Sequence, residues 1–143
     1  MQAMQLVNRA SKLLLLFLIA FSQYGCEDDN DNNGDGNFSR DDYVGTWTCR
    51  EISGPFAPQV YDVIMEAGTA SDELVLRGLA NQGVDFAVRA RIVNQGFNIP
   101  LQTVDGLSIT GTAATSGSIS PTDLVFDLDD GSGASTTEAE LTR

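Results

Sequence analysis

The chain has 143 residues, with 20 acidic against 8 basic side chains, no histidine and a formal net charge of −12. This charge excludes binding to nucleic acid or to an anionic lipid surface, because both require cations that neutralise phosphates. Without histidine, neither a serine–histidine–acid nor a cysteine–histidine arrangement can be built, and zinc loses its commonest nitrogen ligand. The acidic residues fall mostly in the N-terminal part, in turns or on outward faces, so we expect no enzyme, no cofactor and no metal site.

The first 25 residues have the organisation of a secretory signal peptide. Arg9 and Lys12 precede the unbroken apolar run Leu13–Phe21, and a short polar stretch follows it. This run has only about half of the roughly 20 apolar residues that a membrane-spanning helix needs. We therefore predict export with cleavage after residue 25.

The residues that follow resemble the processing site of bacterial lipoproteins, in which a small residue, here Gly25, precedes an invariant cysteine, here Cys26. The resemblance implies that Cys26 carries the lipid, becomes the mature N-terminus and anchors the protein to a membrane. The acidic stretch Glu27–Asp29 resembles the signal that sends such lipoproteins to the outer face of the outer membrane. We expect a lipid-anchored, surface-exposed location in the bacterial cell envelope; the alternatives are retention at the inner membrane and plain secretion.

Residues 26–39 have two interpretations. From Asp29 to Gly34 they follow the first half of an EF-hand loop, but Arg40 stands at the twelfth position, where a bidentate glutamate normally closes the shell. No aliphatic side chain occurs between Cys26 and Phe38, so the segment cannot bury enough surface to fold. The sequence therefore predicts a disordered acidic tether that binds no calcium.

The chain has two cysteines, Cys26 and Cys49. If Cys26 carries lipid, no disulfide can form within the chain, and the folded domain depends on packing alone. Cys49 is then expected to be a free thiol that behaves as a small buried apolar side chain.

Residues 40–143 alternate between apolar and polar side chains with period two, which predicts strands that have one buried face. The inward sets are Tyr43, Gly45, Trp47 and Cys49; Tyr61, Val63 and Met65; Leu74 and Leu76; Val84, Phe86, Val88, Ala90 and Ile92; Phe97, Ile99 and Leu101; Leu107, Ile109 and Gly111; Leu124, Phe126 and Leu128; and Thr137, Ala139 and Leu141. Short turns rich in glycine, asparagine and aspartate separate these sets, which implies an antiparallel meander. The predicted fold is all-β, an eight-stranded antiparallel up-and-down barrel, with a two-sheet sandwich as the alternative.

The stretch Tyr43–Trp47 resembles the Gly-x-Trp opening of lipocalins and related calycin barrels. Together with the strand count and the leader, it makes residues 40–143 similar to the small lipocalin-like lipoproteins of Bacteroidetes. The resemblance implies that Trp47 closes the floor of the barrel and that a basic residue from a late strand packs across it. Arg143 is the candidate for that residue.

A barrel of eight strands is either filled by its own side chains or holds one small ligand. We take Trp47, Arg143, Tyr61, Phe86 and Phe126 as the residues of barrel closure and of a possible pocket, with a small apolar ligand entering opposite Trp47. The alternative is a structural or interaction lipoprotein with a filled barrel. Carbohydrate recognition is disfavoured, because the pattern does not cluster the aromatic side chains. We expect a monomer.

Overall fold

The computed structural model describes residues 37–143, so the leader, Cys26 and most of the predicted tether lie outside the described residues. The elements in chain order are the one-turn helix α2 (Arg40–Tyr43), β1 (Gly45–Ser53), β2 (Gln59–Ala67), β3 (Glu73–Arg77), the 3₁₀ turn η1 (Leu79–Asn81), β4 (Ala87–Val93), β5 (Gly96–Val104), β6 (Leu107–Thr115), β7 (Thr122–Asp129) and β8 (Ala134–Thr142).

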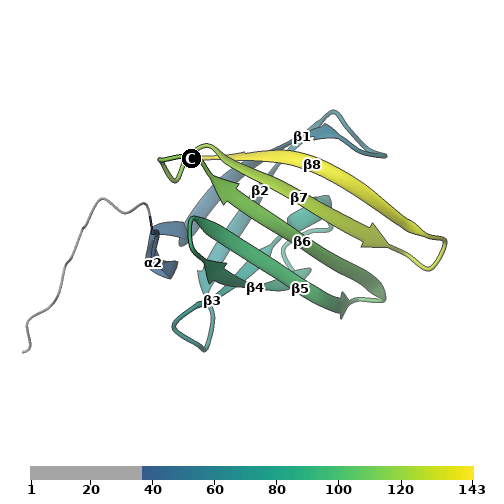
Figure 1. Ribbon diagram of the computed structural model, residues 1–143. Helices are drawn as coiled ribbons and strands as arrows, with labels where there is room; N and C mark the ends of the chain where they lie inside the picture. The colour runs from purple at the N-terminus through teal and green to yellow at the C-terminus, as the bar shows by residue number, and fades with distance from the viewer. Residues whose placement is uncertain (1–36) are drawn as a thin grey trace, which may run out of the picture. The chain divides into compact units, whose positions relative to one another are not determined.

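The eight strands form one closed barrel (Figure 1). Each strand pairs antiparallel with the next, and β8 returns to pair with β1, where Cys49 lies opposite Leu141. This confirms the predicted all-β, eight-stranded antiparallel barrel and excludes the sandwich. The architecture is consistent with a calycin-like fold. Among the helices of residues 37–143, none has the length and apolar character needed to cross a bilayer.

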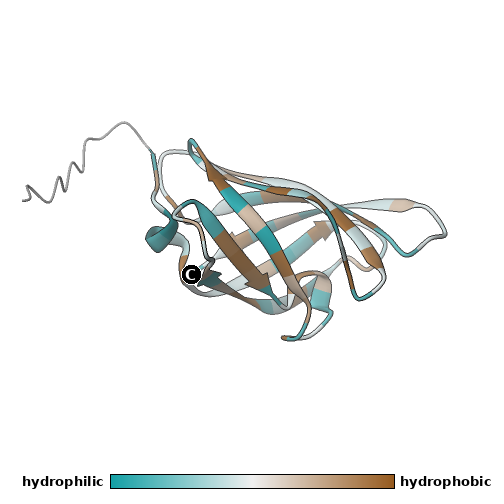
Figure 2. Cartoon of the chain, turned by 90° about the horizontal axis from the view of Figure 1, so that it is seen from below, coloured by the Kyte–Doolittle hydropathy of each residue, from teal (hydrophilic) through white to brown (hydrophobic). Residues whose placement is uncertain are grey.

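The core fills the inside of the barrel, because alternate side chains of every strand point inward. Apolar and polar segments alternate along the strands, as Figure 2 shows. Fully buried side chains of the largest volume are Trp47, Tyr43, Phe97, Phe126, Met65, Leu74, Leu76, Leu79, Ile99, Ile109, Leu124 and Leu141. Phe38, which falls in the predicted tether, packs against this core.

Tyr43 departs from the prediction that it belongs to the first strand. It is buried as expected but lies in α2, whose start is fixed by Asp42: one carboxylate oxygen accepts hydrogen bonds from the Ser39 backbone N–H at 2.8 Å and the Ser39 hydroxyl at 2.7 Å. A polar side chain that bonds the first turn of a helix competes with an extended backbone. Period two therefore located the buried ring but not its secondary structure.

Two predicted inward residues point outward. Leu101 is 76% exposed, because the register of β5 against β6 shifts between Ile99 and Gln102 and the shift reverses the alternation. Pro100 stands inside this irregular stretch and has no N–H to contribute to a regular ladder. Val84 is 59% exposed because it lies in the loop before β4 rather than in the strand.

Candidate ligand-binding site at the open end of the barrel

The two ends of the barrel differ. One end carries α2, the C-terminus and the turns at residues 68–72, 94–95 and 116–121. The other carries the loops at residues 54–58, 78–86, 105–106 and 130–133 (Figure 1). We call the first the closed end and the second the open end.

Trp47 and Arg143 meet at the closed end. The guanidinium carbon of Arg143 lies 5.0 Å from the centroid of the Trp47 ring, within the range of a cation–π interaction. The same guanidinium donates a hydrogen bond to the Val44 carbonyl at 3.2 Å. The Trp47 indole N–H donates to the Tyr43 carbonyl at 2.7 Å, and the two rings stack at a centroid distance of 6.2 Å. The side chain of Trp47 is fully buried, so this end of the barrel is sealed by packed groups.

The closed end also contains a buried polar atom that the sequence analysis did not identify, the hydroxyl oxygen of Tyr43. It makes no hydrogen bond among the described residues. The nearby Thr115 hydroxyl donates to the Gln95 carbonyl at 2.9 Å. Burial, with the neighbouring charge of Asp42, raises the pKa of Tyr43 to about 12. A buried hydroxyl without a partner costs stability rather than adding to it.

A recess of about 340 Å³ lies at the open end. Its lining residues come from the open-end loops and the strand ends beside them: Pro55, Phe56, Gln82, Leu107, Leu128, Asp130, Ser132, Gly133 and Ser135. This volume is at the lower limit of the roughly 300 to 1,000 Å³ typical of small-molecule sites. Apolar side chains and a few polar groups thus converge at the end opposite Trp47.

None of the residues predicted for the pocket lines this recess. Phe86 and Phe126 are buried in the core. A Cβ placed on the small residue Gly111 would lie 2.6 Å from the Val125 carbonyl oxygen and 2.8 Å from the Phe126 Cβ, so the neighbouring strand lies directly against this glycine. Beside Gly45 the nearest atom is a guanidinium nitrogen of Arg143.

Tyr61 belongs to a polar network that lies in the open half of the barrel. Glu51 is only 2% exposed, and its carboxyl accepts hydrogen bonds from the Tyr61 hydroxyl at 2.9 Å and the Gln59 amide at 2.8 Å. The Tyr61 hydroxyl in turn accepts from the Ala80 backbone N–H at 3.2 Å, and the Asn81 amide donates to the Gln59 oxygen at 3.2 Å. The network thus fastens η1 to β2.

The fastening matters because Ala80 and Asn81 have positive φ angles of 57° and 56°. Non-glycine residues in this left-handed region cost of the order of 1 kcal/mol each and persist only where their surroundings hold them. The hydrogen bonds to Tyr61 and Gln59 supply that constraint at the rim of the barrel.

Sequence reasoning missed Glu51, although a signal for it is present. It is two residues beyond Cys49, which is two beyond Trp47, so all three share the inward face of β1.

The inward neighbours of Glu51 include titratable groups. Cys49 is fully buried and free, and burial raises the pKa of its thiol to about 11. Burial is also the largest cause that raises the pKa of Tyr61. A glutamate at the next inward position is buried, and a buried polar group needs hydrogen-bond partners. Its position in the alternation was therefore the signal for a polar network inside the barrel.

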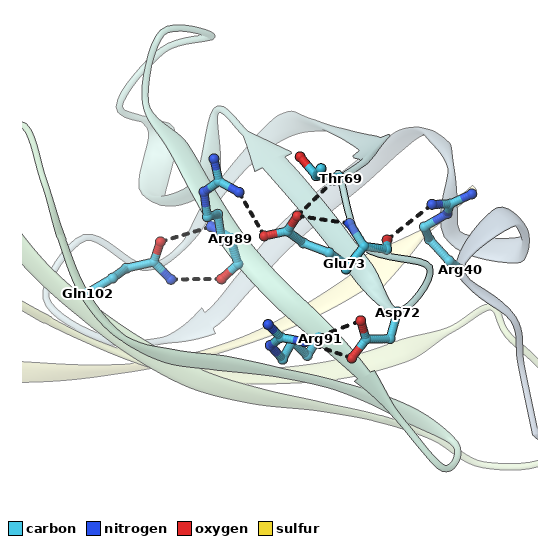
Figure 3. Close-up of polar contacts among 8 residues, drawn as sticks. Arg40, Thr69, Asp72, Glu73, Arg89, Arg91 and Gln102 are labelled. Atoms are coloured by element: carbon cyan, nitrogen blue, oxygen red, sulfur yellow. Dashed lines mark hydrogen bonds and ion pairs between the residues drawn. The ribbon is translucent and has the colours of Figure 1, made fainter.

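A second recess, of about 220 Å³, lies on the outer wall across β3, β4 and β5. There the Glu73 carboxylate accepts hydrogen bonds from the Arg89 guanidinium at 2.7 Å and the Thr69 backbone N–H at 2.8 Å (Figure 3). The Gln102 side chain accepts from the Arg89 backbone N–H at 2.9 Å and donates to the Arg89 carbonyl at 2.7 Å. Gln102 thereby replaces the ladder bonds that β5 cannot make beside Pro100. These polar groups form hydrogen bonds with one another and connect β3, β4 and β5, so we assign this recess a structural role rather than a ligand-binding one.

Within residues 37–143 no three cysteine, aspartate or glutamate side chains are grouped as a metal site would require. No protein-family model, no curated protein and no solved structure matches the chain.

Proposed function

We propose that this chain is a lipid-anchored lipoprotein of the bacterial cell envelope whose lipocalin-like barrel binds a small apolar ligand at its open end. The observation that carries the proposal is the recess of about 340 Å³, which lies opposite the end sealed by Trp47 and Arg143. Concave, partly apolar sites with a few convergent polar groups are the usual form of small-molecule sites.

The packed interior limits the size of the ligand. Phe126 and its neighbours fill the barrel below the rim, so a ligand has the recess itself and the apolar side chains of Phe56, Leu107 and Leu128. Burying about 200 Å² of apolar ligand surface contributes about 5 kcal/mol, before the cost of association is subtracted. We therefore expect a compact ligand that binds more weakly than about 1 μM.

The anchored location is supported by the leader and by Gly25–Cys26. The described chain enters the barrel at the closed end, so a tether from Cys26 joins the domain at the end opposite the recess. A fully extended chain spans at most about 3.5 Å per residue, so a segment of the length of residues 27–36 can separate the domain from the membrane by at most a few tens of ångströms. We expect Cys26→Ser to move the protein from the membrane fraction to the soluble fraction of fractionated cells. A variant that is cleaved and still membrane-bound would contradict anchoring at Cys26.

Binding is tested with the neutral naphthalene dye Prodan, whose emission shifts to the blue in apolar surroundings. We expect saturable binding to the full chain and a loss of affinity in Phe56→Ser, because Phe56 lines the recess and is 67% exposed, so that its removal spares the core. Ile52→Ser is the matched control, since Ile52 is 57% exposed on the outer face of β1.

The filled interior also favours a second function, a surface lipoprotein that acts through its outer wall and loops without a small ligand. The dye separates the two. No saturable binding would support the second function, and equal binding by the Phe56 and Ile52 variants would place the dye outside the recess and contradict the first.

A further inference from the structure

The four loops at the open end of the barrel carry formal negative charge only. These loops, residues 54–58, 78–86, 105–106 and 130–133, contain Asp85, Asp105 and Asp130 but no lysine or arginine. All three aspartates are exposed. Like charges around a low-dielectric opening add their fields and attract cations to it.

No described ion pair neutralises these aspartates. The ion pairs of residues 37–143 are Arg40–Asp41, Arg50–Glu140, Arg77–Glu66, Arg89–Glu73 and Arg91–Asp72. Arg143 is at the closed end, over Trp47. Arg77, the last residue of β3, donates to the Val84 carbonyl of the open-end loop at 3.4 Å, but its ion pair is with Glu66. The three loop aspartates therefore have no ion-pair partner among the described residues.

Asp130 brings this charge into the recess, because it is one of the lining residues. Its Oδ1 accepts hydrogen bonds from the Ser132 backbone N–H at 3.0 Å and the Ser132 hydroxyl at 2.5 Å. These bonds hold the pKa of Asp130 below its ordinary value. Phe56 and Leu107 line the same recess, so charge and apolar surface are found together in it.

A buried carboxyl lies near these loops. The Glu51 carboxyl lies inside the open half of the barrel, and the two side chains that donate to it, Tyr61 and Gln59, are neutral. No arginine pairs with Glu51 among the described residues.

We propose that the recess selects small organic cations, that is, amines that carry a compact apolar group. The apolar group contacts Phe56 and Leu107, while the ammonium lies on the side of Asp130. An anion of the same size is repelled by the same charges. This inference rests on the proposed function, since it names the class of ligand for that recess.

Three ligands of one shape test it: hexylammonium, hexanol and hexanoate, each competing with Prodan on the full chain at low ionic strength. We expect hexylammonium to bind at least about fivefold more tightly than hexanol, hexanoate to bind most weakly, and the preference to shrink as salt is added.

Asp130→Asn is the variant that removes the charge and keeps the turn, because an asparagine oxygen can accept the bonds from Ser132. We expect it to weaken hexylammonium about two- to fivefold and to leave hexanol unchanged. Asp123→Asn is the matched control, since Asp123 is exposed on β7 near the closed end; we expect it to change neither affinity.

The failures of the two proposals differ. Equal affinities for the three ligands, or dye binding that none of them displaces, would overturn the selection of cations and leave the dye site in place. An equal loss of hexylammonium affinity in the Asp123 and Asp130 variants would reduce the effect to net charge and also overturn it. The absence of dye binding would remove the proposed function itself.

Discussion

Replacing Trp47 and Arg143, singly and together, measures how much each side chain at the closed end contributes to the free energy of unfolding. Trp47 is the chain's single tryptophan, its ring is fully buried, and its N–H donates to the Tyr43 carbonyl at 2.7 Å. Arg143 is exposed and covers the ring from outside at 5.0 Å. The two side chains should therefore contribute very different amounts to the free energy of unfolding.

The magnitudes follow from burial. Trp47→Ala removes a buried aromatic side chain, which costs about 3 to 5 kcal/mol, and much of a small domain's stability can be lost with it. Arg143→Ala loses a cation–π contact of about 0.5 to 1 kcal/mol at an exposed site. It also loses one hydrogen bond to Val44, worth about 0.5 to 1.5 kcal/mol. We expect about 1 to 2.5 kcal/mol in total.

The assay is urea denaturation followed by far-ultraviolet circular dichroism, because variants without the tryptophan have no indole emission. Trp47→Phe stands in where Trp47→Ala does not fold, and the pair Trp47→Phe and Arg143→Met forms a double-mutant cycle with an expected coupling of about 0.5 to 1 kcal/mol. In the native protein we expect blue-shifted tryptophan emission that iodide quenches weakly, with stronger quenching in Arg143→Ala.

Two results would refute this reasoning. Red-shifted emission that iodide quenches freely in the native protein would place Trp47 in solvent. A coupling of zero in the cycle, with Arg143→Met as stable as the native protein, would show that the guanidinium does not contribute to closure.

Three further predictions concern polar side chains, and urea midpoints measure all of them. Tyr43→Phe should change stability by less than about 0.5 kcal/mol or raise it, because the deleted hydroxyl is buried without a described partner; a loss above about 1 kcal/mol would mean that the hydroxyl is bonded, for example to a buried water. Glu51→Ala should cost about 1 to 3 kcal/mol, because the Tyr61 hydroxyl loses its buried acceptor; an unchanged midpoint would contradict the network. The pKa of Glu73 is lowered, first by its hydrogen bond from Arg89, so its contribution is present above the unfolded carboxyl pKa of about 4.3 and is lost as the pH falls through the lower folded value. Glu73→Gln should therefore flatten the acid limb of stability against pH, and parallel curves for the two proteins would count against this.

The contact between Trp47 and Arg143 at the closed end could be predicted, because it depends only on the alternation of side chains and on the position of the last strand in the chain. Period two places Trp47 on the inward face of the first strand, and closure of a barrel brings the last strand beside it. Arg143 at the chain end then lies near Trp47 wherever the eight strands form. The same period failed at Leu101, because alternation propagates only through a regular ladder, and the register shift beside Pro100 reverses it.

The chain itself determined the strand count, the antiparallel order, the inward face of each regular strand and the sign of the charge, since these follow from period, turn composition and residue counts. Only the tertiary structure decided where space remains. Gly111 leaves no room for a Cβ, because Val125 and Phe126 of the neighbouring strand lie directly against it. The recess is instead formed by Phe56, Leu107 and Asp130, which are separated along the chain and meet only when the barrel closes. Leu107 could be placed on the inward face because strand side chains alternate, but Phe56 and Asp130 lie in loops, whose side chains follow no such period. The barrel could therefore be predicted from the sequence, whereas the recess could not.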